Sequence, residues 1–164
     1  MHKPHSIILK YLLFFNRVNY SRSGKNMNLS WKDKSYYFKG LLLLIGKDFI
    51  ISEEERHLLQ DIGKALGFEQ KFIDSSIDNL LENKYIIDEP PVFSGKEIAK
   101  IFIKDGIRVA ISDKDMHPFE IEWLQKVAKA NGLSENFVSE QIDFYLRNQY
   151  LKEKHNSLEV HNFE

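Results

Sequence analysis

The sequence predicts an all-α fold in which two similar three-helix halves, related by an internal duplication, pack around one core. Three observations predict it. The 164 residues include only four prolines and eight glycines, so few residues interrupt a helix. Apolar residues recur at helical spacing, and no alternating pattern of useful strand length occurs. In addition, residues 48–85 are repeated at residues 113–150.

The repeat aligns Asp48–Tyr85 with Asp113–Tyr150 without a gap, at an offset of 65 residues. Thirteen of the paired positions are identical. Self-similarity at a fixed offset indicates a duplicated supersecondary unit. Because two copies do not build a solenoid, we expect two halves packed face to face, with repeat units at residues 36–87 and 94–150.

The first half begins with the segment SYYFKGLLLLIG, which is apolar nearly all round. We therefore expect it to form the central and most buried helix. The next helix carries one apolar stripe and ends at Gly67, where a left-handed backbone is accessible to glycine. The third helix places its apolar residues on one face, at Phe72, Ile73, Ile77, Leu80 and Leu81.

The second half follows the turn IDEPPVF, because Pro90 and Pro91 cannot continue a helix. The segment 94–112 is predicted to form an amphipathic helix, which starts with a capping box of Ser94 and Glu97. The two later helices repeat the buried positions of the first half and flank Gly132. These positions are Trp123, Leu124, Val127, Ala128 and Ala130, then Phe137, Val138, Ile142, Tyr145 and Leu146.

Residues 1–30 form a basic and apolar extension before the helical domain, which we place at residues 31–150. The apolar run from Ile7 to Phe15 is far shorter than the roughly 20 residues that span a bilayer. One interpretation is a misassigned start, with translation beginning at Met27. The other is an anchor that lies on a membrane surface through residues 1–26. Residues 151–164 are expected to form a flexible tail.

Charge and composition exclude several classes of function. Five Lys or Arg and no acid lie in residues 1–26, so the remaining residues carry 18 cations against 24 acids. A domain with net negative charge is a poor general nucleic-acid binder, and we expect no nucleic-acid partner. The absence of cysteine excludes disulfides, thiolate metal sites and a cysteine nucleophile. No Gly-rich phosphate loop, nucleophile elbow or zinc-protease motif occurs, so we expect no enzyme.

Acidic residues recur at both copies of one helix start. In the first copy Ser52 is a natural N-cap, and Glu55 completes a capping box. In the second copy His117 takes the cap, Pro118 the first helical position, and Glu120 the third. Capping therefore accounts for both glutamates.

Cation binding is the alternative for the same acids, since Asp48 and Asp113 lie several residues before their helices. Carboxylate oxygens are the ligands that Ca²⁺ and Mg²⁺ prefer. Packing of the two halves would then bring together Asp48, Glu55, Asp113 and Glu120, or each Asp–Glu pair would act separately. His117 is a further candidate ligand. The segment after Asp113 is not an EF-hand, because it lacks the glycine at the sixth place and the glutamate at the twelfth.

A basic stripe recurs every four residues along the segment 94–112. It consists of Lys96, Lys100, Lys104 and Arg108. Such a stripe can bind a phosphate surface or an acidic partner. The alternative is a solvated helix face, because Glu97 and Asp105 stand three residues before Lys100 and Arg108 as local partners. The aromatic residues, both tryptophans included, are expected to fill the core and a groove.

The stretches DFIISEEERHLLQDIGKALGF and DKDMHPFEIEWLQKVAKANGL together resemble the TerB-like (tellurite-resistance protein B) family, which is related to the N-terminal domain of the co-chaperone DjlA. The resemblance covers about Tyr37 to Tyr150. It implies an all-helical, duplicated bacterial domain that is cytoplasmic or at the inner face of the membrane and linked to stress and tellurite resistance. Acids bind metal in that family, which here implies Asp48, Glu55, Asp113 and Glu120. Family members usually place Gly after the motif Asp, whereas Phe49 and Lys114 stand here.

Two hypotheses for function result. The first is a non-enzymatic TerB-like module that binds a divalent cation through the paired acids. The second is a protein-interaction module without metal, in which the groove between the halves or the basic stripe docks another protein. Metal dependence separates the two, and the sequence does not predict an oligomeric state.

Overall fold

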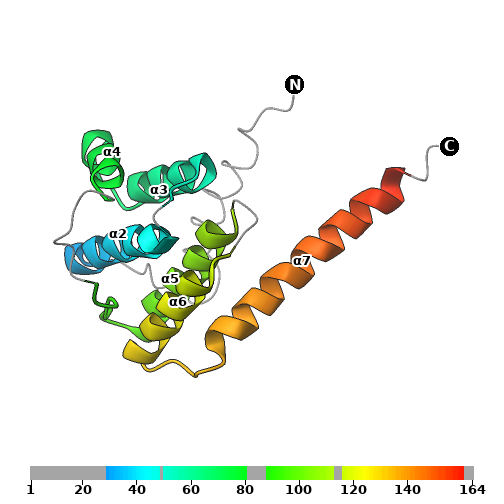
Figure 1. Ribbon diagram of the computed structural model, residues 1–164. Helices are drawn as coiled ribbons and strands as arrows, with labels where there is room; N and C mark the ends of the chain where they lie inside the picture. Colours follow the sequence, from blue (N-terminus) through cyan, green and yellow to red (C-terminus); the bar gives the residue numbers. More distant parts are fainter. Residues whose placement is uncertain (1–28, 49, 81–87, 113–115, 161–164) are drawn as a thin grey trace.

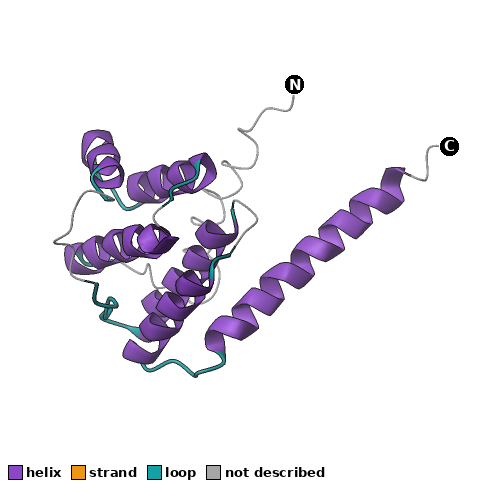
Figure 2. Ribbon diagram, in the orientation of Figure 1, coloured by secondary structure: helices purple, strands orange, loops and turns teal. Residues whose placement is uncertain are grey.

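The computed structural model describes residues 29–48, 50–80, 88–112 and 116–160. Within these ranges the chain forms six α-helices and one short 3-10 helix, without a strand (Figures 1 and 2). The all-α prediction is therefore confirmed. In chain order the elements are α2 (Trp31–Ile45), η1 (Gly46–Asp48), α3 (Glu53–Ala65), α4 (Gln70–Asp78), α5 (Lys96–Ile111), α6 (Pro118–Ala130) and α7 (Phe137–Val160).

The helices fall into two three-helix groups, α2–α4 and α5–α7. Their first members start at Trp31 and Lys96, and their second members start at Glu53 and Pro118. Both pairs reproduce the offset of the sequence repeat. Helix α2 contacts α3, α5 and α6, while α5 contacts α3, α6 and α7. This arrangement is compatible with the duplication that the sequence predicts.

A single core joins the two groups, and α2 lies at its centre. Every residue of α2 from Gly40 to Ile45 is buried, as the all-round apolar pattern predicts. A Cβ at Gly40 would lie 2.9 Å from the Phe102 ring, so the missing side chain lets α2 approach α5 closely. The largest fully buried side chains come from both groups: Tyr37, Leu41, Leu44, Ile45, Leu59, Leu66, Ile73, Ile77, Phe102, Ile103, Ile107 and Trp123.

The helix ends show which local signals the fold uses. Gly67 and Gly132 adopt φ angles of 89° and 65°, as the sequence predicts for the residues that end α3 and α6. The capping box predicted at Ser94 is wrong. Gly95 is the N-cap of α5 and makes no side-chain cap. Ser94 instead donates from its backbone N–H and its hydroxyl to the carboxylate of Asp33.

Several expected core positions lie at the surface. Phe72 is 50% exposed and Leu146 is 48% exposed, although both stand on the apolar faces that the repeat predicts. Phe72 lies in the first turn of α4, which packs mainly on α3, so its ring lies at the edge of the core. Ala65 and Ala130, the last residues of α3 and α6, are also exposed.

Helix α7 is longer than expected. It continues beyond residue 150 to Val160. No glycine or proline interrupts the helix after Phe137, which explains its length. In Figure 1 it extends away from the bundle. Among the described residues, no helix combines the length and the apolar character needed to cross a membrane. Residues 1–28, which make up most of the expected extension 1–30, lie outside the described ranges.

Candidate functional site

The first repeated glutamate is a buried cap. Glu55 is 4% exposed, and its Oε2 accepts the backbone N–H of Ser52 at 2.8 Å and the Ser52 hydroxyl at 3.0 Å. In return, the Glu55 N–H donates to the Ser52 hydroxyl oxygen at 3.2 Å. The predicted capping box is confirmed, and the carboxylate lies at the positive end of α3.

The second repeated glutamate does the same at α6. Glu120 is 2% exposed, and its Oε2 accepts the backbone N–H of His117 at 2.8 Å. His117 Nδ1 accepts the N–H of Phe119 at 3.3 Å, and Pro118 takes the first helical position. His117 is therefore a helix cap, as predicted.

The cation-site hypothesis for these acids stays a prediction. Asp48 ends η1, but its side chain lies outside the described residues, and so does all of Asp113. Within the described part of the chain, no three His, Asp or Glu side chains gather in a way that would hold a metal ion. Glu55 and Glu120 act as helix caps. Whether their carboxylates lie close to those of Asp48 and Asp113 falls outside the described residues.

The basic stripe on α5 is partly neutralised by its own helix. Lys100 pairs with Glu97 at 2.7 Å, and Arg108 pairs with Asp105 at 3.5 Å. Both are the local partners that the sequence predicts. Lys96 and Lys104 are exposed, and Lys96 lies beside Gly132 at the end of α6. These contacts favour a solvated helix face, while a partner on the stripe stays a prediction.

A buried polar contact joins the two central helices. The Tyr37 hydroxyl donates a 2.6 Å hydrogen bond to Asp105 Oδ2, and both side chains are buried. Burial raises the pKa of the Asp105 carboxyl, although Tyr37 and Arg108 act in the opposite direction. Burial and the neighbouring carboxylate also raise the pKa of Tyr37 well above its ordinary value. Neither group was singled out in the sequence for such a contact.

A second buried aspartate holds the start of α2 against the start of α5. Asp33 is 3% exposed and accepts the hydroxyls of Ser30 and Ser94 at 2.6 and 2.7 Å. It also accepts the Ser94 N–H at 2.9 Å. Burial alone would raise the pKa of Asp33, but these hydrogen bonds outweigh burial and lower it. The contact is structural, since every oxygen of this carboxylate is engaged.

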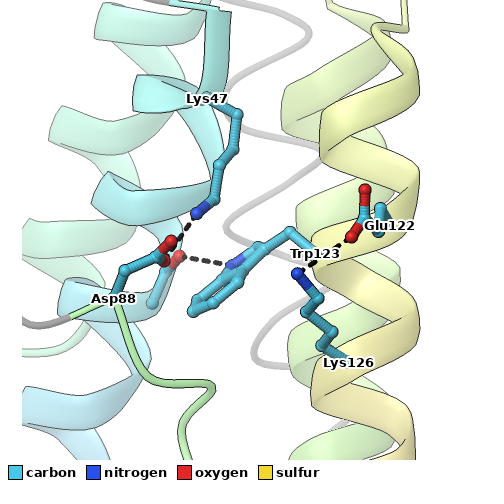
Figure 3. A network of polar contacts seen from close by, with 6 residues as sticks. Lys47, Asp88, Glu122, Trp123 and Lys126 are labelled. Atoms are coloured by element: carbon cyan, nitrogen blue, oxygen red, sulfur yellow. Dashed lines mark hydrogen bonds and ion pairs between the residues drawn. The ribbon is translucent and has the colours of Figure 1, made fainter.

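Figure 3 shows a polar network between η1, the segment before α5, and α6. The Lys47 ammonium pairs with Asp88 at 2.5 Å and lies 4.4 Å from the ring centroid of Trp123. The indole N–H of Trp123 donates to the carbonyl of Gly40 at 3.2 Å. Lys47 thus fixes one half against the other through a cation–π contact and an ion pair.

The exposed face of α2 carries aromatic rings and lysines. Trp31 is 67% exposed and Tyr36 is 37% exposed, so neither ring belongs to the core. Lys34 Nζ lies 5.0 Å from the Trp31 ring centroid, and Lys32 Nζ lies 5.5 Å from that of Tyr36. The signal in the sequence is the stretch WKDKSYYFK. In it Lys34 follows Trp31 by three residues and Tyr36 follows Lys32 by four, which are the spacings of neighbours on a helix surface.

These rings continue onto α4. Phe68 stands between Trp31 and Phe72, with centroid distances of 6.2 and 5.2 Å, and Phe38 lies beneath it in the core. Because Phe72 is half exposed, the cluster of Trp31, Phe68 and Phe72 forms an aromatic surface over the junction of α2 and α4.

Helix α7 exposes further apolar residues. Its start packs on α5 and α6, where Val138 is fully buried. About two turns later, Phe144 is 66% exposed and Leu146 is 48% exposed. Comparisons with protein-family models, with curated proteins and with solved structures found no match for the chain.

Proposed function

We propose that the chain is a non-enzymatic helical module of the TerB-like kind that works by binding another protein in a stress or tellurite-resistance system. The observation that carries the binding role is the exposed ring of Phe144 on α7. The TerB-like assignment rests on the repeated helix starts at Glu55 and Glu120, whose capping boxes have the same register in both halves.

Helix α7 presents the geometry of a partner-binding helix. It has 24 residues, and among those whose side chains the structure describes, Val138 is buried while Ile142 and Tyr145 pack partly against the core. A helix without tertiary packing is only marginally stable in water, so an extended helix gains from a partner that covers it. Phe144 follows Phe137 by seven residues, and leucines follow at positions 151 and 158. Positions seven apart share one face of a helix, which suits docking in an apolar groove.

Site-specific photo-crosslinking tests this proposal. A benzoylphenylalanine placed at Phe144 in the full chain, expressed in its own cells, is expected to crosslink to one reproducible protein. The matched control places the same group at Phe119, which is 55% exposed on α6. Adducts at neither position, or the same set of adducts at both positions, would contradict a specific partner on α7.

Divalent cation binding is the second candidate. What supports it is that Glu55 and Glu120 are buried carboxylates at equivalent positions, each seven residues after an aspartate of the repeat. Calorimetric titration of Ca²⁺ and Mg²⁺ into the metal-stripped full chain tests it. Saturable heat that disappears when Asp48→Asn is combined with Asp113→Asn would support the site. Absence of heat with either ion would leave the four acids as caps and loop residues.

A further inference from the structure

We propose that the exposed face of α2, together with Phe72, binds an anionic lipid surface. This inference is independent of a protein partner on α7, because the two surfaces share no residue. It also differs from an anchor in residues 1–26, because it assigns the contact to residues of the folded domain.

Every exposed or half-buried residue of α2 before Gly40 is cationic, aromatic or serine. These residues are Trp31, Lys32, Lys34, Ser35, Tyr36 and Lys39. On a helix Trp31, Lys32, Ser35, Tyr36 and Lys39 occupy one continuous arc, and Lys34 lies on the other side of the buried Phe38. Asp33 is the one carboxylate of α2, and it faces inward to Ser30 and Ser94. The arc therefore presents positive charge that no acid of its own helix offsets.

The aromatic rings on this face suit the boundary between lipid and water. Tryptophan and tyrosine favour the headgroup level, where one part of the ring system is apolar and another part is polar. Trp31 and Phe72 flank Phe68, which gives the surface a wide apolar contact. The lysines lie close to the rings. Lys34 Nζ, for example, is 5.0 Å from the centroid of the Trp31 ring, so a membrane that contacts the ring also contacts the positive charge.

Charge along the chain orients this face. Residues 1–39 contain eight Lys or Arg and a single acid, the buried Asp33, whereas the rest of the chain has more acids than cations. An anionic surface attracts the first part and repels the second. Near the aromatic cluster, Glu69 is exposed beside Lys71, so the excess of cations comes from α2.

A lipid surface explains these features better than an acidic protein does. The face is the convex side of a single helix, and its recognition elements are lysines and interfacial rings. Such a face needs no shaped partner, because a bilayer adapts to it and supplies many equivalent anionic groups. If the partner were an acidic protein instead, the chain would not bind anionic vesicles.

Vesicle flotation with the full chain tests the inference. The probes are vesicles of phosphatidylcholine alone and of phosphatidylcholine mixed with phosphatidylglycerol. We expect binding to the mixed vesicles only, weakened by added salt. Each lysine close to an anionic leaflet contributes about five-fold in affinity, so Lys32→Glu with Lys34→Glu is expected to lower binding by about 25-fold or more. Trp31→Ala is expected to weaken binding as well, with less dependence on salt.

Matched controls separate this face from general electrostatic adsorption. Lys126→Glu with Lys129→Glu makes the same change of charge on α6, and Phe119→Ala removes an exposed ring there. Both controls are expected to bind like the wild type, and circular dichroism checks that each variant is folded. Three results would overturn the inference: a wild-type chain that does not bind, α2 variants that bind unchanged, or a control that loses as much.

Discussion

The hydroxyl of Tyr37 in α2 donates a 2.6 Å hydrogen bond to Oδ2 of Asp105 in α5, and this contact links the two halves at their centre. Arg108 pairs with the other carboxylate oxygen at 3.5 Å. A buried carboxylate is costly unless its oxygens have partners. The packing of α2 on α5 therefore depends on a polar contact as well as on the apolar core.

Replacing Tyr37 with phenylalanine leaves Asp105 buried with one partner fewer. Loss of a partner from a buried polar group costs about 1–3 kcal/mol, so we expect Tyr37→Phe to lower the free energy of unfolding by that amount. Urea unfolding followed by circular dichroism measures it. Tyr36→Phe is the control, because Tyr36 is exposed and its hydroxyl has no such role. Equal stability of the two variants would show that the contact contributes nothing.

Asp105 also predicts a pH dependence of stability. Burial raises its pKa in the folded protein above the ordinary value of 3.8. As the pH rises above that value, the unfolded chain loses the proton first, so the free energy of unfolding falls until the folded-state pKa is passed. Asp105→Asn has no such proton. Subtracting its curve from that of the wild type should leave a difference that declines with pH across this window, and a flat difference would refute the prediction.

The sequence predicted those features that depend on neighbours a few residues away. The capping boxes at Glu55 and Glu120 need only the residue three positions earlier, and the left-handed glycines only the end of a helix. Ser94 shows the limit of such signals. Its spacing to Glu97 fits a capping box, but in the fold the backbone N–H of Ser94 donates to the carboxylate of Asp33, which is 61 residues away in the sequence.

The same limit explains the surfaces that were not predicted. Trp31 and Trp123 have the same side chain, yet only the indole N–H of Trp123 donates to a buried acceptor. That acceptor is the carbonyl of Gly40, which is 83 residues away in the sequence. Trp31 begins a helix, where its ring can reach Phe68 but no further layer covers it. Tertiary contacts therefore decide which aromatic residues form the core and which remain available at the surface.

The network around Trp123 gives a third prediction. Lys47 is largely buried, and its ammonium contacts both Asp88 and the indole ring. Lys47→Met keeps the length of the side chain but removes both contacts, so we expect a loss of about 1 kcal/mol in the free energy of unfolding. Lys126→Met is the control, since Lys126 pairs with Glu122 on its own helix in an exposed position. Urea unfolding that shows no difference between the two variants would exclude a stabilising role for the cation–π contact.

The fourth prediction concerns the left-handed end of α3. Gly67 has a φ angle of 89°, and a Cβ there would meet no atom within 4 Å. Any penalty therefore comes from the backbone alone, and Gly67→Ala is expected to lower the free energy of unfolding by about 1–2 kcal/mol. Gly67→Asn is the matched variant, because asparagine tolerates this region better than other residues with a side chain do. Thermal and urea unfolding should rank glycine above asparagine and asparagine above alanine. If alanine equalled glycine, α3 would have to end without a left-handed residue.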